Sequence, residues 1–167
     1  MDITTDQIKT LREESGAGIM ECRNALKEAN GDKAKALDIL QKSGTLKAQK
    51  TAGRVAKQGL ITSYIHAGGR IGALVELNTE TDFVARTNEF KDLAYNIAMQ
   101  VAAMSPEFIS KEECPTGANI DFQNACLLLQ PYIKDPAKTI QDIVTELIAK
   151  TGENIKIGRF IRFELGK

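Results

Sequence analysis

The sequence is poor in the side chains from which most active sites are built. Its 167 residues include a single histidine, three cysteines and no tryptophan. A Ser/His/Asp or Cys/His site would have to use His66, and no serine or cysteine stands in the context of a recognisable nucleophile. A P-loop motif is missing, and the GAG run at 16–18 lacks the third glycine of a dinucleotide-binding loop. We therefore predict that the protein is not an enzyme and has neither catalytic residues nor a cofactor.

The cysteines and the paired acids give no sign of a metal centre. Cys22, Cys114 and Cys126 are odd in number and form no CxxC pair, which argues against a disulfide framework and a zinc knuckle. The acids in Glu13-Glu14 and in Glu112-Glu113 are adjacent, so their side chains point in different directions on a helix or strand. We interpret the cysteines as small buried or indifferent thiols and predict no metal site.

Long apolar runs and an excess of one charge are also absent. No stretch approaches the roughly 18–20 apolar residues that span a bilayer, and Asp2 stands where a secretory signal has basic residues. We therefore expect a cytoplasmic protein with no membrane contact. The 22 basic residues balance 22 acidic ones, which argues against a protein whose main task is to neutralise a nucleic-acid backbone. A local basic patch is compatible with this balance.

Residues 1–45 carry the signals of three short helices, which predict a small N-terminal domain. Thr4 with Gln7 fits a capping box, and the apolar spacing after it predicts a helix over about 5–14. Residues 15–18 break this helix, and a second apolar stripe follows until Asn30-Gly31. Asp32 is the predicted cap of a third helix, which we expect Ser43-Gly44 to close.

A basic stretch follows, and we place the domain boundary there, with a linker over 46–58 and a core domain over 59–167. Between Lys42 and Lys57 the chain has five basic residues and no acid. Two interpretations stay open: a solvated helical linker whose lysines lie in water, or a strip that meets an acidic partner surface.

The core domain begins where the apolar period changes from helical to two. Residues 60–66 and 71–78 fit a β-hairpin, and a third strand is predicted over 155–165. One face of the second strand should consist of Ile71, Ala73, Val75 and Leu77.

Helices complete the predicted core. They are expected over 89–104 and from Thr139 to Thr151, whereas the pattern at 107–136 predicts no definite element. Three strands with helices on one side make an α+β fold. An open face or edge of so small a sheet favours self-association.

The connection at 79–86 breaks the usual pattern, because it puts an acid beside a large aromatic between a strand and a helix. In one interpretation Thr81 caps a helical turn, Asp82 favours its positive N-terminus and Phe83 folds back into the core. In the other, Phe83 fills an apolar slot on a partner, and Asp82 adds a negative charge beside it.

Several blocks of the sequence match one known family, in that family's order and over nearly the whole chain. They are LR at 11–12, GAGIMEC at 16–22, ALKEANGD at 25–32, RIGALVELN at 70–78, ETDFVAR at 80–86, GENI at 152–155 and RF at 159–160. Together they resemble the elongation factor Ts family, the nucleotide-exchange factors for elongation factor Tu in bacterial and organellar translation.

The resemblance implies an N-terminal three-helix domain similar to ubiquitin-associated domains, a linker helix, and a core with a three-stranded antiparallel sheet. It also implies guanine nucleotide exchange on GDP-bound and nucleotide-free elongation factor Tu, by disturbing the partner's magnesium and phosphate site so that GTP can rebind. The residues that it implies near the partner's magnesium are Thr81, Asp82, Phe83 and Val84. Those that it implies on the partner's nucleotide-binding domain are Arg12, Ile19 and Met20.

The chain departs from the family in length and at two positions. Longer members carry a duplicated core and a coiled-coil insertion, for which 167 residues leave no room. The resemblance to the short members of the family implies that this protein forms a homodimer through its core sheet. Gly158 stands where an arginine is usual, and Ile19 where methionine is frequent.

Two other functions compete with nucleotide exchange. One is a nucleic-acid or ribosome-associated module built on the basic stretch, which would bind RNA with a strong dependence on salt. The other is a ubiquitin-associated-type interaction domain fused to an oligomerisation core, without exchange activity.

Overall fold

The computed structural model describes residues 3–116 and 119–167, and the chain divides into two compact units. The helical unit comprises Met1–Gly53 with Thr145–Glu153, and the sheet unit comprises Arg54–Val144 with Asn154–Lys167. No helix within the described ranges is both long and apolar enough to cross a membrane.

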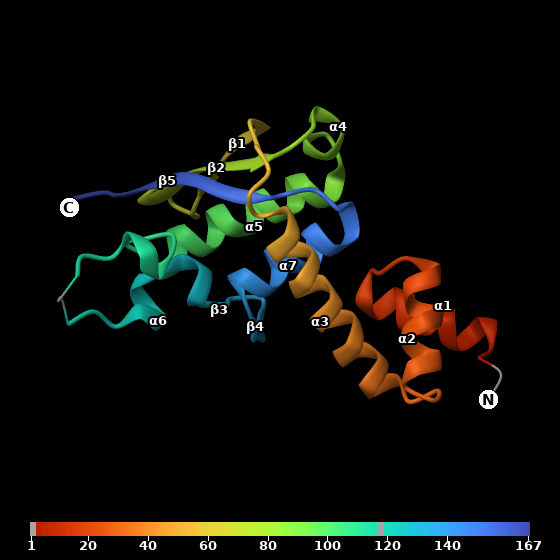
Figure 1. The fold of residues 1–167 in the computed structure, drawn as a ribbon. Coiled ribbons are helices and arrows are strands. Elements are labelled where there is room, and N and C mark those ends of the chain that lie inside the picture. Colours follow the sequence, from red (N-terminus) through yellow and green to blue (C-terminus); the bar gives the residue numbers. More distant parts are fainter. Residues whose placement is uncertain (1–2, 117–118) are drawn as a thin grey trace. The chain divides into compact units, whose positions relative to one another are not determined.

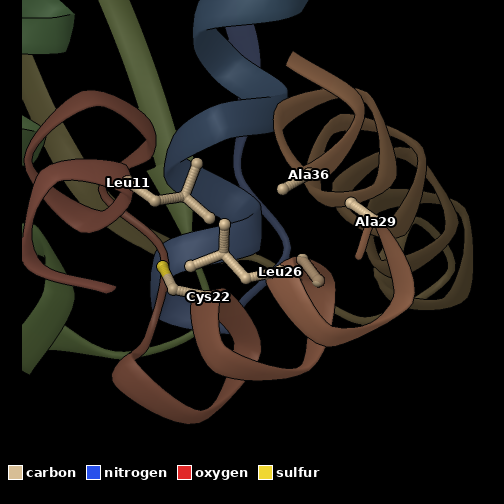
Figure 2. Packing of buried hydrophobic residues seen from close by; sticks show 6 residues of the cluster. Leu11, Cys22, Leu26, Ala29 and Ala36 are labelled. Atoms are coloured by element: carbon tan, nitrogen blue, oxygen red, sulfur yellow. The ribbon is translucent and has the colours of Figure 1, made fainter. Parts of the chain in front are cut away.

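The helical unit begins with the three predicted helices, α1 (Thr5–Ser15), α2 (Ile19–Glu28) and α3 (Lys33–Thr51). The capping box of Thr4 and Gln7 is confirmed, and Gly16 ends α1 with a φ of 66°. Asp32 caps α3 by accepting a hydrogen bond from the Lys35 amide. A small apolar core joins the three helices (Figure 2). Its buried members are Leu11, Cys22, Ala25, Leu26, Ala29 and Ala36.

The predicted end of the third helix at Ser43-Gly44 is wrong, because α3 continues without a break to Thr51. Gly44 is buried inside α3, and a Cβ atom at this position would lie 3.1 Å from the Cβ of Ala149. The glycine therefore allows a close contact between two helices instead of ending one. Ala149 belongs to α7 (Ile140–Thr151), whose residues from Thr145 onward are part of the helical unit.

The sheet unit contains the predicted three-stranded antiparallel sheet, which confirms the α+β class. Its order is β1 (Gln58–Ile65), β2 (Ile71–Thr79), β5 (Lys156–Glu164), with β2 in the centre. The predicted inner face of β2 is confirmed for Ala73, Val75 and Leu77, which are buried, whereas Ile71 at the start of the strand is half-buried.

Helix α5 (Asn88–Met104) covers that inner face and contacts all three strands (Figure 1). The apolar side of this helix is buried from Phe90 to Val101, whereas Met104 at its end is 40% exposed. The opposite face of the sheet, here called the outer face, keeps large apolar side chains exposed. They are Ile61, Ile65, Leu74, Ile161 and Phe163.

The stretch without a predicted element consists of short pieces of structure. They are η1 (Lys111–Glu113), α6 (Phe122–Ala125), η2 (Leu127–Leu129), β3 (Pro131–Tyr132) and β4 (Asp135–Thr139). Two fully buried amides hold it to α5: Gln100 Nε2 donates to Gln130 Oε1 at 3.2 Å and to the Pro131 carbonyl at 3.0 Å. Buried amides need such partners. These hydrogen bonds therefore hold in place a stretch whose sequence has no regular hydrophobic pattern.

Candidate functional site

The connection after β2 forms one helical turn, α4 (Asp82–Ala85), whose start is capped as the sequence indicates. Thr81 accepts a hydrogen bond from the Val84 amide at 3.4 Å through its hydroxyl. Ala85 is the buried residue of the turn, and Val84 is half-buried. The turn is therefore anchored on one side and leaves the opposite side to solvent.

Phe83 lies on the solvent side of α4 and is 79% exposed, so the interpretation that it folds back into the core is wrong. Phe90, on the next helix, is the aromatic that fills the core there, with no exposed surface. A helix of one turn buries only one side, and Ala85 occupies that side. Folding therefore leaves this aromatic ring available to a partner.

Asp82 stands beside Phe83 and pairs with a basic residue one turn later. Its Oδ2 lies 2.8 Å from Nη2 of Arg86, and the two side chains are 47% and 77% exposed. An ion pair so exposed to water is weak, so a partner can displace Arg86 from the carboxylate at little cost. The carboxylate also lies in the first turn of α4, where the exposed backbone amides favour negative charge.

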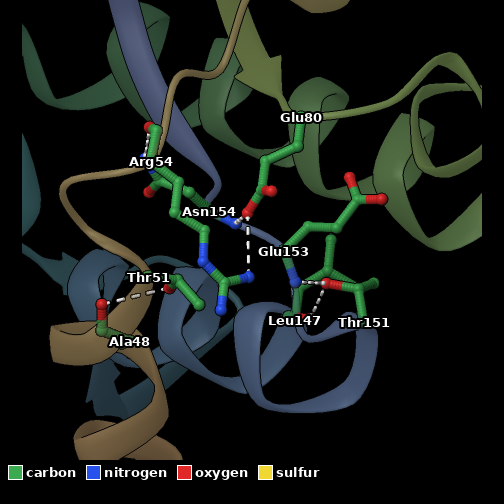
Figure 3. Close-up of polar contacts among 8 residues, drawn as sticks. All are labelled: Ala48, Thr51, Arg54, Glu80, Leu147, Thr151, Glu153 and Asn154. Atoms are coloured by element: carbon green, nitrogen blue, oxygen red, sulfur yellow. Dashed lines mark hydrogen bonds and ion pairs between the residues drawn. The ribbon is translucent and has the colours of Figure 1, made fainter.

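Glu80, which directly precedes the capping threonine, connects the turn to the residues just before β5. Its Oε1 accepts a hydrogen bond from the Asn154 amide at 2.6 Å and lies 3.5 Å from Nη1 of Arg54 (Figure 3). Asn154 Nδ2 in turn donates to the Arg54 carbonyl at 2.7 Å. Three chain segments that are distant in the sequence therefore meet immediately before α4.

Sequence reasoning did not find this cluster, although its members fall within or beside matched blocks. Glu80 opens the ETDFVAR block, and Asn154 belongs to the GENI block. Nothing in the local pattern of either block indicates the other, because the contact joins residues 74 positions apart.

The residues predicted to bind the partner from the N-terminal domain lie in the helical unit. Arg12 is exposed near the end of α1, and Ile19 and Met20, in the first turn of α2, are 56% and 60% exposed. Two neighbouring apolar side chains in water at a helix start form a small apolar surface.

The basic stretch is less cationic than its sequence indicates. Lys42 pairs with Asp38, Lys47 with Glu21, and Arg54 with Glu80. The hydrogen bond from Lys47 holds the pKa of the Glu21 carboxyl below its ordinary value, which keeps the acid ionised. Three of the five basic side chains are thus matched by acids of the same chain.

In the part of the chain that the structure describes, no group of three or more His, Cys, Asp and Glu side chains could hold a metal ion. The chemistry of α4 is that of a contact surface: an exposed aromatic ring, a weakly paired carboxylate and a capped backbone turn.

Comparisons with known proteins assign the chain to a family. The family model described as "Elongation factor TS" matches residues 45–120. Elongation factor Ts of Thermotoga maritima is 48% identical over 195 aligned positions, which cover 100% of this chain and 98% of that relative.

The proteins of the same name from Carboxydothermus hydrogenoformans and Syntrophomonas wolfei are 48% and 47% identical and cover 99% of this chain. The alignments span 195 positions against 167 residues here, so these relatives have residues that this chain lacks. The chain therefore belongs to the elongation factor Ts family.

Proposed function

We propose that this protein is a guanine nucleotide exchange factor for elongation factor Tu, and that it promotes GDP release by disturbing the magnesium and phosphate site of that partner. The observation that carries the proposal is the exposure of Phe83 on a capped, anchored turn of an elongation factor Ts chain. Exchange of this kind uses no catalytic residue of the factor itself.

Phe83 is suited to be the group that displaces the partner's structure. Burying a phenylalanine side chain that was exposed is worth about 1.5–3 kcal/mol, and this ring gains little of that during folding. Binding in an apolar slot on the partner would remove the ring from water and supply most of this free energy. Thr81 and Val84 fix the turn, so the ring is presented with little loss of backbone entropy on binding.

Asp82 adds a negative charge next to the ring. We propose that it leaves Arg86 and either competes electrostatically for the partner's cationic groups or accepts hydrogen bonds from backbone amides that the displacement exposes. Both roles favour a partner whose magnesium ligands have moved.

Linkage explains why no contact with the guanine nucleotide is needed. A factor that binds the nucleotide-free partner more tightly than the GDP-bound partner must weaken GDP binding by the same ratio. Each tenfold ratio corresponds to about 1.4 kcal/mol. Magnesium is an effective target because in P-loop GTPases it bridges phosphate oxygens to protein ligands.

The three N-terminal helices α1, α2 and α3 supply the second proposed contact, in the manner of a ubiquitin-associated domain. Arg12, Ile19 and Met20 are exposed there and offer one cation and two apolar groups to the partner's nucleotide-binding domain. Because Lys42, Lys47 and Arg54 are paired with acids, we favour this protein surface over RNA binding by the basic stretch.

We further propose that the protein is a homodimer through the outer face of its sheet. A solvated sheet face normally carries polar residues, yet five large apolar side chains lie here. The register sets Leu74 beside Ile161 and Gly72 beside Phe163, so the apolar groups are contiguous across two strands. A second copy of the same face would cover them with matching chemistry and remove them from water.

The exchange proposal is tested by the release of a fluorescent GDP analogue from elongation factor Tu in excess unlabelled GDP. Catalytic amounts of the wild type should accelerate release, and Phe83→Ala should lose most of the acceleration while remaining folded. Phe122→Ala is the matched control, because Phe122 is a partly exposed aromatic outside α4. Asp82→Asn then separates charge from volume.

No acceleration by the folded wild type would refute the exchange function. If Phe83→Ala accelerates GDP release as well as the wild type does, the protein is an exchange factor but α4 is not the segment responsible.

The dimer is tested by sedimentation: the wild type should sediment at twice 18.3 kDa, Leu74→Lys as a monomer, and the control Val55→Lys as a dimer. A monomeric wild type would overturn the dimer proposal.

A further inference from the structure

Two of the three cysteines, which the sequence presents as unrelated, meet in the segment between α5 and β3. The Sγ atoms of Cys114 and Cys126 lie 3.5 Å apart, and both thiols are free. Cys22 is buried in the helical unit, among Leu11, Leu26 and the rest of that core. The chain thus has one close thiol pair and one isolated thiol.

The backbone on both sides of the pair is held in place. The Cys114 amide donates to the Lys111 carbonyl at 3.1 Å, which closes η1. The Cys126 amide donates to the Phe122 carbonyl at 3.0 Å, and a parallel bridge joins Cys126 to Phe108. The two sulfurs therefore face each other because of local structure, and a disulfide needs them to close to about 2.05 Å.

The two thiols differ in their surroundings. Cys114 is partly exposed, whereas Cys126 has no exposed surface. Burial and the hydrogen bond with Cys114 raise the pKa of the Cys126 thiol to about 11. Cys126 is therefore protonated at neutral pH and out of reach of an oxidant, so the reaction must begin at Cys114.

We propose that Cys114 and Cys126 form a redox modification site, at which a low-molecular-weight disulfide such as oxidised glutathione converts the two thiols into an intramolecular disulfide. The Cys114 thiol gives up its proton as its sulfur attacks one sulfur of the glutathione disulfide; the S–S bond of glutathione breaks, and the departing glutathione thiolate takes up a proton. The Cys126 thiol then gives up its proton as its sulfur attacks the Cys114 sulfur; the bond between Cys114 and glutathione breaks, and the second glutathione thiolate leaves and takes up a proton. Two thiols are oxidised and one disulfide is reduced, so the electrons balance.

Proximity makes the second step efficient despite the high pKa of Cys126. Its sulfur is 3.5 Å from the atom that it attacks, and a reaction between groups held at such a distance replaces a bimolecular step. The bond would join residues 12 positions apart and brace the segment that leads from α5 to β3. Closing a loop in the unfolded chain stabilises the folded state, so the melting temperature should rise by roughly 5 °C or more.

The experiment treats the full chain with oxidised glutathione and follows it by intact mass and by thiol titration. The wild type and the control Cys22→Ala should each lose two thiols and two hydrogen atoms, without bound glutathione, and should melt at a higher temperature until a reductant is added. Cleavage before Asp121 separates the two cysteines, so the peptides should stay linked until reduction.

Single variants identify the order of events. Cys126→Ala should stop at glutathione bound to Cys114, and Cys114→Ala should take up no glutathione. A wild type that remains reduced, keeps glutathione on Cys114, or links to a second chain through either cysteine would overturn the proposal. None of these measurements depends on nucleotide exchange, so the outcome is independent of the proposed function.

Discussion

Replacing Glu80 by alanine tests whether the contacts before α4 hold the turn that carries Phe83. The substitution removes the acceptor of the Asn154 amide, which lies 2.6 Å away, and the ionic partner of Arg54 at 3.5 Å. We expect a loss of stability in the sheet unit together with a slower exchange reaction, because Thr81, which caps the turn, directly follows Glu80.

The magnitude follows from the two contacts. A hydrogen bond to a charged group contributes about 1.5–3 kcal/mol. The contact with Arg54 adds no more than about 1 kcal/mol, because the Arg54 side chain is 53% exposed. Glu80→Ala should therefore cost about 2–4 kcal/mol. Glu80→Gln keeps an acceptor for Asn154 without its charge and should cost roughly half as much.

Urea unfolding followed by tyrosine fluorescence is the suitable assay. The chain has no tryptophan, and its three tyrosines, Tyr64, Tyr95 and Tyr132, all belong to the sheet unit. The signal therefore reports on the unit that contains Glu80. Arg54→Ala serves as the control that removes the ion pair and leaves the carboxylate on the Asn154 amide.

The reasoning fails if Glu80→Ala costs less than about 1 kcal/mol, or if Glu80→Gln and Glu80→Ala cost the same. Equal costs would mean that the hydrogen bond from Asn154 contributes nothing and that charge alone matters. Full stability with a slower exchange would instead indicate direct contact between Glu80 and the partner.

Two further substitutions test the helical unit. Gly44→Ala should destabilise this unit by about 1–2 kcal/mol, because the new Cβ would crowd Ala149 and outweigh the better helix propensity of alanine. In a double-mutant cycle followed by circular dichroism, adding Ala149→Gly should recover part of the lost stability. A more stable single variant would contradict this. Glu21→Gln should lower the free energy of unfolding by at most about 1 kcal/mol near pH 7. The hydrogen bond from Lys47 lowers the pKa of Glu21 in the folded state from its ordinary 4.5. The stabilisation that the Glu21 carboxylate contributes is therefore present above pH 4.5 and disappears as the pH falls through the folded pKa. A stability difference between the wild type and Glu21→Gln that persists in acid would refute this pairing.

Most regular elements could be predicted from the sequence because their causes are local. The hydroxyl of Thr4, the carboxylate of Asp32 and the alternation along β2 act within a few residues, and each has the predicted effect. The same holds for the cap at Thr81, whose hydroxyl binds the amide of Val84 only three residues later and so starts α4 locally. The blocks that match the family could also be recognised in the sequence, because each is a contiguous run of residues.

One prediction failed because a distant residue decides the outcome. Gly44 has the local signature of a helix end, but its contact with Ala149, more than 100 positions away, makes it a close-packing site inside α3. For Phe83 the local sequence pattern left two interpretations open, the core and a partner, and the exposure of its side chain in the structure excludes the core.

The sequence by itself determined the helix caps, the faces of the central strand and the position of the turn that carries Phe83, because these depend on neighbouring residues. Only the tertiary structure decided that Phe83 faces solvent, that Glu80 meets Asn154 and that Cys114 meets Cys126. These features depend on which distant segments pack together. Such packing depends on the volumes and polar partners of the whole chain, and no short stretch of sequence contains that information.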